Sequence, residues 1–118
     1  MFTKVLIIVT FSIATAFPTL SFSHAKVTQT YPANEAVLNV APEKITLSFP
    51  EALQITSFKL EDVNGNSIPV QDGKSLSPTN EINATPPKLP QGIYNVFWRG
   101  LSSDGHPTKG HFSFTIAP

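Results

Sequence analysis

Three histidines, His24, His106 and His111, are the side chains of this sequence best suited to hold a metal ion or to exchange a proton near neutral pH. The sequence has no cysteine, and its single methionine is the initiator Met1. Sulfur donors are therefore missing from the rest of the chain. Any metal held by these histidines must be one that accepts nitrogen and oxygen ligands.

The run 102–107 (SSDGHP) is predicted to form a tight turn, in which His106 follows two residues after Asp104. Residues two apart in an extended chain point to the same side, and Pro107 favours an extended conformation for the residue before it. A carboxylate and an imidazole would then converge on one cation. The alternative is that Asp104 and Gly105 simply form a turn and that His106 is a surface residue.

Residues 1–23 have the features of a secretory signal peptide. A lysine at position 4 precedes an apolar run, 5–17, which is too short to cross a membrane as a stable helix. A proline ends this run, and small residues at positions 21 and 23 favour cleavage after Ser23. Cleavage after Ala16 or after Ala25, and retention as an N-terminal anchor, are the alternatives. We expect residues 24–118 to be exported.

Cleavage after Ser23 would make His24 the first residue of the mature protein. An N-terminal histidine offers its α-amine and its ring Nδ1 to the same ion, which closes a chelate from a single residue. Both nitrogens bind only when deprotonated, and an α-amine pKa of about 8 allows a metal to displace the proton near neutral pH. The alternative for His24 is a frayed, solvated terminus.

The rest of the chain is predicted to form strands. Eleven prolines and six glycines interrupt it too often for long helices. Between them, apolar and polar residues alternate in short runs, which is typical of strands. We predict strands at 26–31, 44–49, 58–61, 67–70, 81–84, 92–99 and 111–116.

Two features of this pattern make more specific predictions. Asn64 and Gly65 predict a hairpin between the strands on either side, because both residues tolerate positive φ. The run 92–99 has apolar residues on both faces, with Ile93 and Phe97 on the second face, so we expect it to be buried on both sides. The pattern as a whole predicts an all-β fold, a seven-stranded Greek-key sandwich or barrel of the immunoglobulin-like type, in one small domain.

The charge pattern excludes two classes of function. Eight basic and eight acidic side chains are mixed along the chain and give zero formal net charge. No basic run marks a nucleic-acid-binding surface. Nor does the sequence contain a basic amphipathic helix of the kind that lies on a membrane.

Seven short segments follow the pattern of a known family, and two runs, 92–99 (G-x-Y-x-V-x-W-R) and 102–106 (S-x-D-G-H), are specific when they are taken together. The seven segments are 24–26 (HAK), 31–34 (YPAN), 41–45 (APEKI), 47–51 (LSFPE), 92–99 (GIYNVFWR), 103–106 (SDGH) and 110–114 (GHFSF). In these segments the chain resembles the CopC family of copper-resistance proteins. The resemblance covers essentially all of residues 24–118, which we expect to be a CopC-like copper-binding domain.

The resemblance implies a monomeric periplasmic β-sandwich that binds one Cu(II) ion per chain in copper homeostasis or resistance, without catalysis. Carried over by position, the ligands are the amine and ring of His24, with Asp104 and His106. Glu51 matches an acidic residue near the copper in some members and is an outer or optional ligand. His111 aligns near the site but not at a ligand position, and is expected to be a polar-face strand residue. Members often work beside an inner-membrane copper protein called CopD.

A copper(II) carrier or buffer is therefore the expected function. Some family members carry a methionine-rich loop for Cu(I), which this chain lacks. Three nitrogens and one carboxylate oxygen suit the tetragonal geometry of Cu(II), which also binds such ligands more tightly than the other divalent metals do.

Two alternatives come from other classes of protein. One is a copper-dependent oxidase resembling the lytic polysaccharide monooxygenases, which use a similar N-terminal histidine. Such an enzyme needs an open coordination position, and Asp104 would fill it here. The other alternative is a metal-free immunoglobulin-like structural module.

Overall fold

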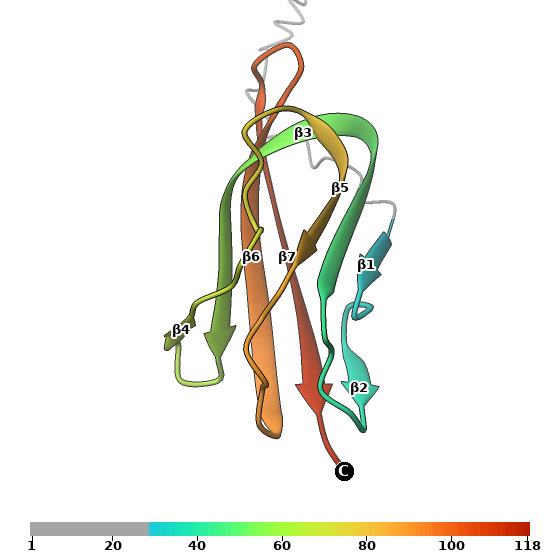
Figure 1. The fold of residues 1–118 in the computed structure, drawn as a ribbon, viewed down its shortest axis with the longest axis vertical. Helices are drawn as coiled ribbons and strands as arrows, with labels where there is room; N and C mark the ends of the chain where they lie inside the picture. The colour runs from blue at the N-terminus through green and yellow to red at the C-terminus, as the bar shows by residue number, and fades with distance from the viewer. Residues whose placement is uncertain (1–28) are drawn as a thin grey trace, which may run out of the picture.

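The structure, a computed structural model, describes residues 29–118 as strands and loops, with no helix in that range. No helix of this described part is therefore long and apolar enough to cross a membrane. The predicted signal peptide, residues 1–23, and the predicted ligand His24 lie outside the described residues. The strands (Figure 1) are β1 (Gln29–Tyr31), β2 (Ala36–Leu38), β3 (Ile45–Asp62), β4 (Ser67–Ile68), β5 (Thr79–Ala84), β6 (Gly92–Ser102) and β7 (Pro107–Ile116). The predicted all-β class is confirmed.

The longest strand, β3, joins the two runs 44–49 and 58–61, which the sequence predicts as separate strands. Its pairing register shifts between Ser48 and Leu53, where the strand bends over one end of the molecule (Figure 1). The Asn80 side-chain amide donates a hydrogen bond of 3.1 Å to a carbonyl at this bend. Before the bend β3 pairs with β1 and β5, and after it β3 pairs with β6 and β4. One strand thus contributes to both layers of the fold.

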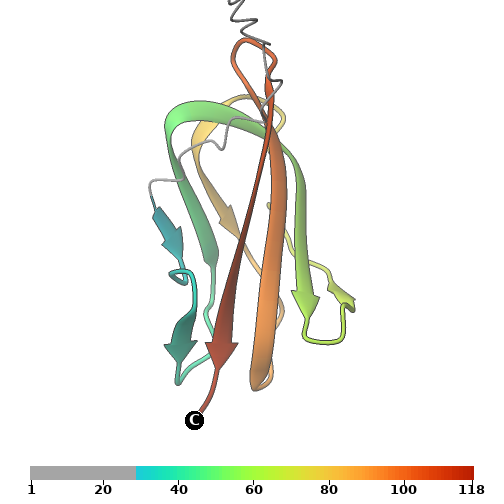
Figure 2. The same cartoon turned by 180° about the vertical axis from the view of Figure 1, so that it is seen from behind.

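The pairing runs around the molecule in the order β1-β3-β6-β7-β2. β2 pairs in parallel with the end of β7, and a short connection joins it to β1. Both views place β1 and β2 along the same edge (Figures 1 and 2), so the sheet curls into the predicted sandwich or barrel. β2 is not evident from the sequence, because three residues are too few to show an alternating pattern.

The core lies between the two layers and is filled mainly by inward-facing residues of β3, β6 and β7. Phe49 and Trp98 meet edge-on with ring centroids 5.3 Å apart and tie the first half of β3 to β6. Tyr94 stacks on Phe114 and donates a 2.6 Å hydrogen bond to the carbonyl of Pro90. The four aromatic residues are structural, since each of them is at most 5% exposed.

The prediction that β6 is buried on both faces is wrong. Tyr94, Val96 and Trp98 on one face are at most 3% exposed, whereas Ile93 and Phe97 on the other are 48% and 41% exposed. Apolar residues on both faces of a run indicate burial only if a second layer covers each face. The outer side of β6 remains open to solvent.

Glycine is required at position 110, where β7 passes over Trp98. A Cβ there would lie 2.5 Å from indole atoms Cε2, Cζ2 and Nε1. Because Trp98 is buried and cannot move away freely, we expect Gly110→Ala to destabilise the fold by about 1–3 kcal/mol. Urea unfolding should show a lower midpoint, while Ser113→Ala, on the outward side of β7, should stay within about 0.5 kcal/mol of wild type. An unchanged midpoint for Gly110→Ala would contradict this packing.

Candidate metal centre

The loop of the β6–β7 hairpin carries two of the predicted ligands, Asp104 and His106. The backbone closes this loop with two hydrogen bonds of 2.9 Å, from Ser102 N to His106 O and from Gly105 N to Ser102 O. Gly105 has a φ of 84°, in the left-handed region that favours glycine. A turn followed by one left-handed residue is a common three-residue hairpin loop. The sequence Asp-Gly at these positions favours such a loop.

The hairpin between β3 and β4 is built in the same way. Asp62 N donates to Asn66 O and Gly65 N donates to Asp62 O, both at 3.0 Å, and Gly65 has a φ of 81°. The hairpin predicted from Asn64 and Gly65 is confirmed, although only the glycine takes positive φ. The carboxylate of Asp62 also accepts backbone hydrogen bonds from Asn64 and Asn66, each 2.9 Å. The side chain of its first residue, Asp62, thus stabilises this loop, as the side chain of Ser102 does in the β6–β7 loop.

Asp104 and His106 meet on the outside of the β6–β7 loop. His106 Nδ1 lies 2.8 Å from Asp104 Oδ2, and the two side chains are 74% and 63% exposed respectively. The two side chains come together as predicted, but the extended geometry predicted for them is wrong. The left-handed Gly105 between them folds the backbone, and the turn makes the contact. An exposed carboxylate and imidazole that lie in contact can coordinate the same cation.

Ser102 orders this pair. Its hydroxyl accepts a 3.0 Å hydrogen bond from His106 N and donates one to Asp104 Oδ1. The hydrogen bond from Ser102, followed by the charge of His106, lowers the pKa of the Asp104 carboxyl below its usual value, and partial desolvation opposes them. The carboxylate is therefore ionised at neutral pH. Ser102 is not among the residues predicted from the sequence, although a serine at the first position of such a turn often bonds the turn backbone.

Glu51 lies at the same end of the molecule as this loop. It is exposed on β3, two residues before Leu53, which pairs with Ser102. Within residues 29–118, however, no three His, Asp or Glu side chains come close enough together to hold a metal ion. The described part of the chain therefore brings together two of the predicted ligands, Asp104 and His106. A complete metal site would need a further ligand from outside this pair.

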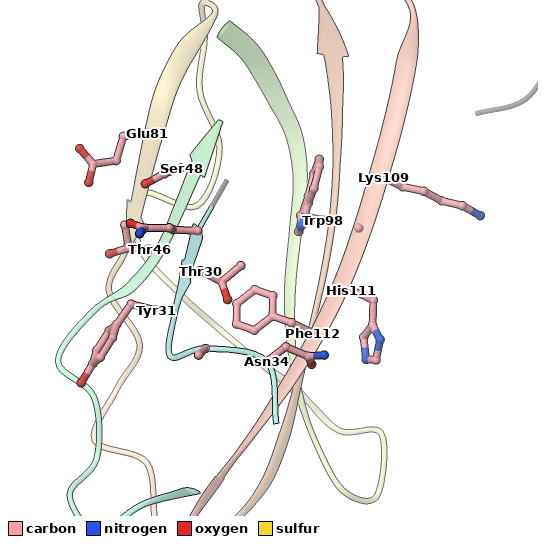
Figure 3. Close-up of a pocket in the computed structure, with 13 residues that line it drawn as sticks. Thr30, Tyr31, Asn34, Thr46, Ser48, Glu81, Trp98, Lys109, His111 and Phe112 are labelled. Carbon is pink, nitrogen blue, oxygen red and sulfur yellow. The ribbon is translucent and has the colours of Figure 1, made fainter. Parts of the chain in front are cut away.

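His111 lies on the outward side of β7, as predicted for a polar-face residue, and away from the loop. A cleft of about 900 Å³ opens between β1 and β7. Figure 3 shows Trp98 and Phe112 on its inner side; Lys109 and His111 also line it, with their side chains directed outward from β7. None of the predicted ligands that the structure describes lines this cleft. The Asp104–His106 loop is therefore the better candidate for metal binding.

The fold and the loop together define a small all-β domain that presents an exposed Asp–His pair at the end of one hairpin. A family model described as the CopC domain matches residues 27–117. The chain belongs to the CopC family, which confirms the resemblance drawn from the sequence segments.

Individual relatives are similar over most of the chain. Protein YobA of Escherichia coli (strain K12) is 36% identical over 106 residues, which covers 80% of each chain. Copper resistance protein C of Xanthomonas campestris pv. juglandis is 34% identical over 111 residues, which covers 81% of this chain and 82% of that protein. Among solved structures, PcoC, a methionine-rich copper resistance protein from Escherichia coli, matches with a TM-score of 0.64 and 28% identity over 80% of this chain and 100% of that one.

Proposed function

We propose that this protein is a periplasmic copper(II)-binding protein that carries or buffers one Cu(II) ion in copper homeostasis or resistance. The observation that carries the proposal is the exposed contact between Asp104 and His106, 2.8 Å apart at the end of a hairpin. Relatives named as copper resistance proteins support copper as the ion. The ion is cargo, and we assign the protein no reaction.

The proposed ligands are the α-amine and ring Nδ1 of His24, an imidazole nitrogen of His106 and the carboxylate of Asp104. His106 Nδ1 contacts Asp104 in the absence of metal, so binding exchanges that contact for the ion. Three nitrogens and one anionic oxygen match the tetragonal preference of Cu(II). Glu51 is placed as an outer or optional ligand because it lies on β3 at the same end.

His24 has enough chain to reach the loop. β1 pairs with β3 through Gln29 and Ser48, and β3 pairs with β6 through Leu53 and Ser102. His24 is five positions before Gln29, and Leu53 is five positions after Ser48. Because β1 and β3 are antiparallel, a continuation of β1 along β3 would cover the same distance, about 17 Å for extended chain. Such a segment would end beside Ser102 and the loop that it begins.

The proposal includes the route by which His24 becomes the first residue. Residues 1–23 act as a signal peptide that is removed after Ser23, and residues 24–118 form a monomeric domain in the periplasm. An inner-membrane copper protein of the CopD type is the proposed partner, as donor or acceptor of the ion. The contact map of the described residues fits a single domain, because every strand pairs within one sheet.

The proposed site is tested by comparing the loss of Cu(II) affinity when His106 is replaced with the loss when His111, the other histidine of the described residues, is replaced. We expect His106→Ala to weaken Cu(II) binding by about tenfold to a hundredfold, because a nitrogen ligand is lost. The matched control is His111→Ala, which removes an exposed imidazole from the outer side of β7 and should leave the affinity within about twofold. Competition titrations of the chain beginning at His24 measure both. Equal losses in the two variants would place the site elsewhere.

A further inference from the structure

The open side of the β3–β6–β7 sheet gathers basic and aromatic side chains in two adjacent cross-strand rows. In the first row Lys59 pairs with Phe97, which pairs with His111. In the second, Ser57 pairs with Arg99, which pairs with Lys109. Residues opposite each other on neighbouring strands lie about 5 Å apart. We call this surface, made of Ser57, Lys59, Phe97, Arg99, Lys109 and His111, the basic–aromatic face.

The aromatic centre of this face is exposed but ordered. Phe97 is 41% exposed, and its ring stacks on His111 with centroids 4.6 Å apart and planes 23° from parallel. His111 Nε2 lies 3.2 Å from Asn95 Oδ1, which holds the imidazole in place. Two stacked rings fixed on a rigid sheet form a preorganised contact for an apolar group, because little side-chain entropy is lost on binding.

Positive charge is concentrated on this face, although the net charge of the described residues is negative. Six of the eight Lys and Arg side chains fall within residues 29–118, together with all eight Asp and Glu, so this range is acidic overall. Three of those six cations, Lys59, Arg99 and Lys109, lie in the two rows. The acidic residue nearest to them in register is Glu61, on the next outward position of β3. A cationic area on an acidic domain attracts an acidic partner.

The surface is also hollowed. A depression of about 560 Å³ lies against the face, lined by all of its residues except His111, together with Glu61, Trp98 and Gly110. Figure 3 shows Lys109 and His111 projecting to the same side of β7, opposite to Trp98. A hollow of this size accommodates a few side chains of a partner.

We propose that the basic–aromatic face is a docking surface for an acidic segment of a partner protein. Carboxylates of the segment pair with Lys59, Arg99 and Lys109, and an apolar side chain between them covers Phe97. A lipid surface fits less well, because recognition of anionic membranes uses clusters of about 4–8 Lys or Arg, more than this face carries. The Arg99–Lys109 pair lies two ladder positions from Leu101–Pro107, where the β6–β7 loop begins. A docked partner therefore lies next to that loop, although docking itself requires no copper.

The test uses the metal-free chain 24–118, labelled with ¹⁵N, and a short synthetic peptide of glutamates around one phenylalanine. Peptide binding should shift the amide signals of the two rows and weaken as salt is added. Two triple variants remove the same charge. Lys59→Gln, Arg99→Gln and Lys109→Gln alter the face, and Lys44→Gln, Lys74→Gln and Lys88→Gln alter the other three cations of residues 29–118, all exposed. We expect the first to weaken binding about tenfold, as three exposed ion pairs allow, and the second less than about twofold.

A second comparison isolates the aromatic contribution. Phe97→Ala should weaken binding of the peptide that contains phenylalanine and leave binding of an all-glutamate peptide unchanged. Equal losses in the two triple variants, or no shift of the two rows in wild type, would overturn the proposal. So would binding to phosphatidylglycerol vesicles that depends on the face, without binding to the peptide, since the partner would then be a membrane. Copper affinity should be unchanged in the first triple variant, so failure here is separable from failure of the copper site.

Discussion

Blocking the α-amine of His24 is expected to lower the affinity for Cu(II) by about a hundredfold or more, at or above the upper end of the range for His106→Ala, because it removes a proposed nitrogen ligand and the chelate that this nitrogen closes. Acetylation makes that nitrogen an amide without a basic lone pair and also breaks the chelate that one residue closes. The α-amine can be acetylated selectively near pH 7, because its pKa is about 8 whereas that of lysine is about 10.4. Copper competition titrations before and after acetylation measure the loss.

The control is the same modification in a His24→Ala chain. There the chelate is already broken, so acetylation should weaken binding much less than in wild type, and the difference isolates the coupling of amine and ring. If acetylation of the wild-type chain left its Cu(II) affinity unchanged, the amine would not be a ligand. Equal losses in wild type and His24→Ala would mean that the amine and the ring do not bind the ion together as one chelate.

Reduction is expected to release nearly all of the bound copper. Apart from Met1, the chain has no methionine, and it has no cysteine, so the soft donors that Cu(I) prefers are missing. Ascorbate added to the copper-loaded chain 24–118 in the presence of a chromogenic Cu(I) chelator should transfer most of the ion within the time of mixing and reduction. The chelator without ascorbate should remove far less. Absorbance of the Cu(I)–chelator complex reports both conditions.

This expectation also separates the chain from its methionine-rich relative. PcoC is described as methionine-rich, whereas residues 24–118 of this chain contain no methionine. A protein of that composition has donors that can retain Cu(I) after reduction. Copper that stayed on this chain after complete reduction would require a Cu(I) site made without sulfur, and would contradict the proposed ligand set.

The strands with regular alternation could be predicted from the sequence, and the bend in β3 could not. Alternation at 44–49 and 58–61 indicates two extended runs, but Pro50 between them is as typical of a break as of a corner. Whether Pro50 ends a strand or lies at a bend within one depends on the pairing of β3 with both layers, and pairing is a property of the whole fold. The exposure of Phe97 was mispredicted for the same reason, because a local run of apolar residues does not show which layers cover it.

The candidate site was predicted in part. Asp104 and His106 were identified by their types and spacing, and the structure brings them into contact. The mechanism of that contact depends on Gly105, whose left-handed conformation follows from the same Asn/Asp-Gly rule that identified the other hairpin. Ser102 was missed because a hydroxyl among several in one loop becomes distinctive only when its hydrogen bonds are seen. The part assigned to His24 stays a prediction, since that residue lies outside the described range.

The most direct test of the proposed site is the electron paramagnetic resonance spectrum of the chain 24–118 loaded with one equivalent of Cu(II). Nitrogen nuclei bound in the equatorial plane split the signal of the unpaired electron, so the splitting counts the nitrogen ligands. We predict a tetragonal spectrum with three equatorial nitrogens, two from His24 and one from His106, falling to two in His106→Ala. A spectrum that is the same in wild type and His106→Ala, or one without nitrogen splitting, would contradict the account.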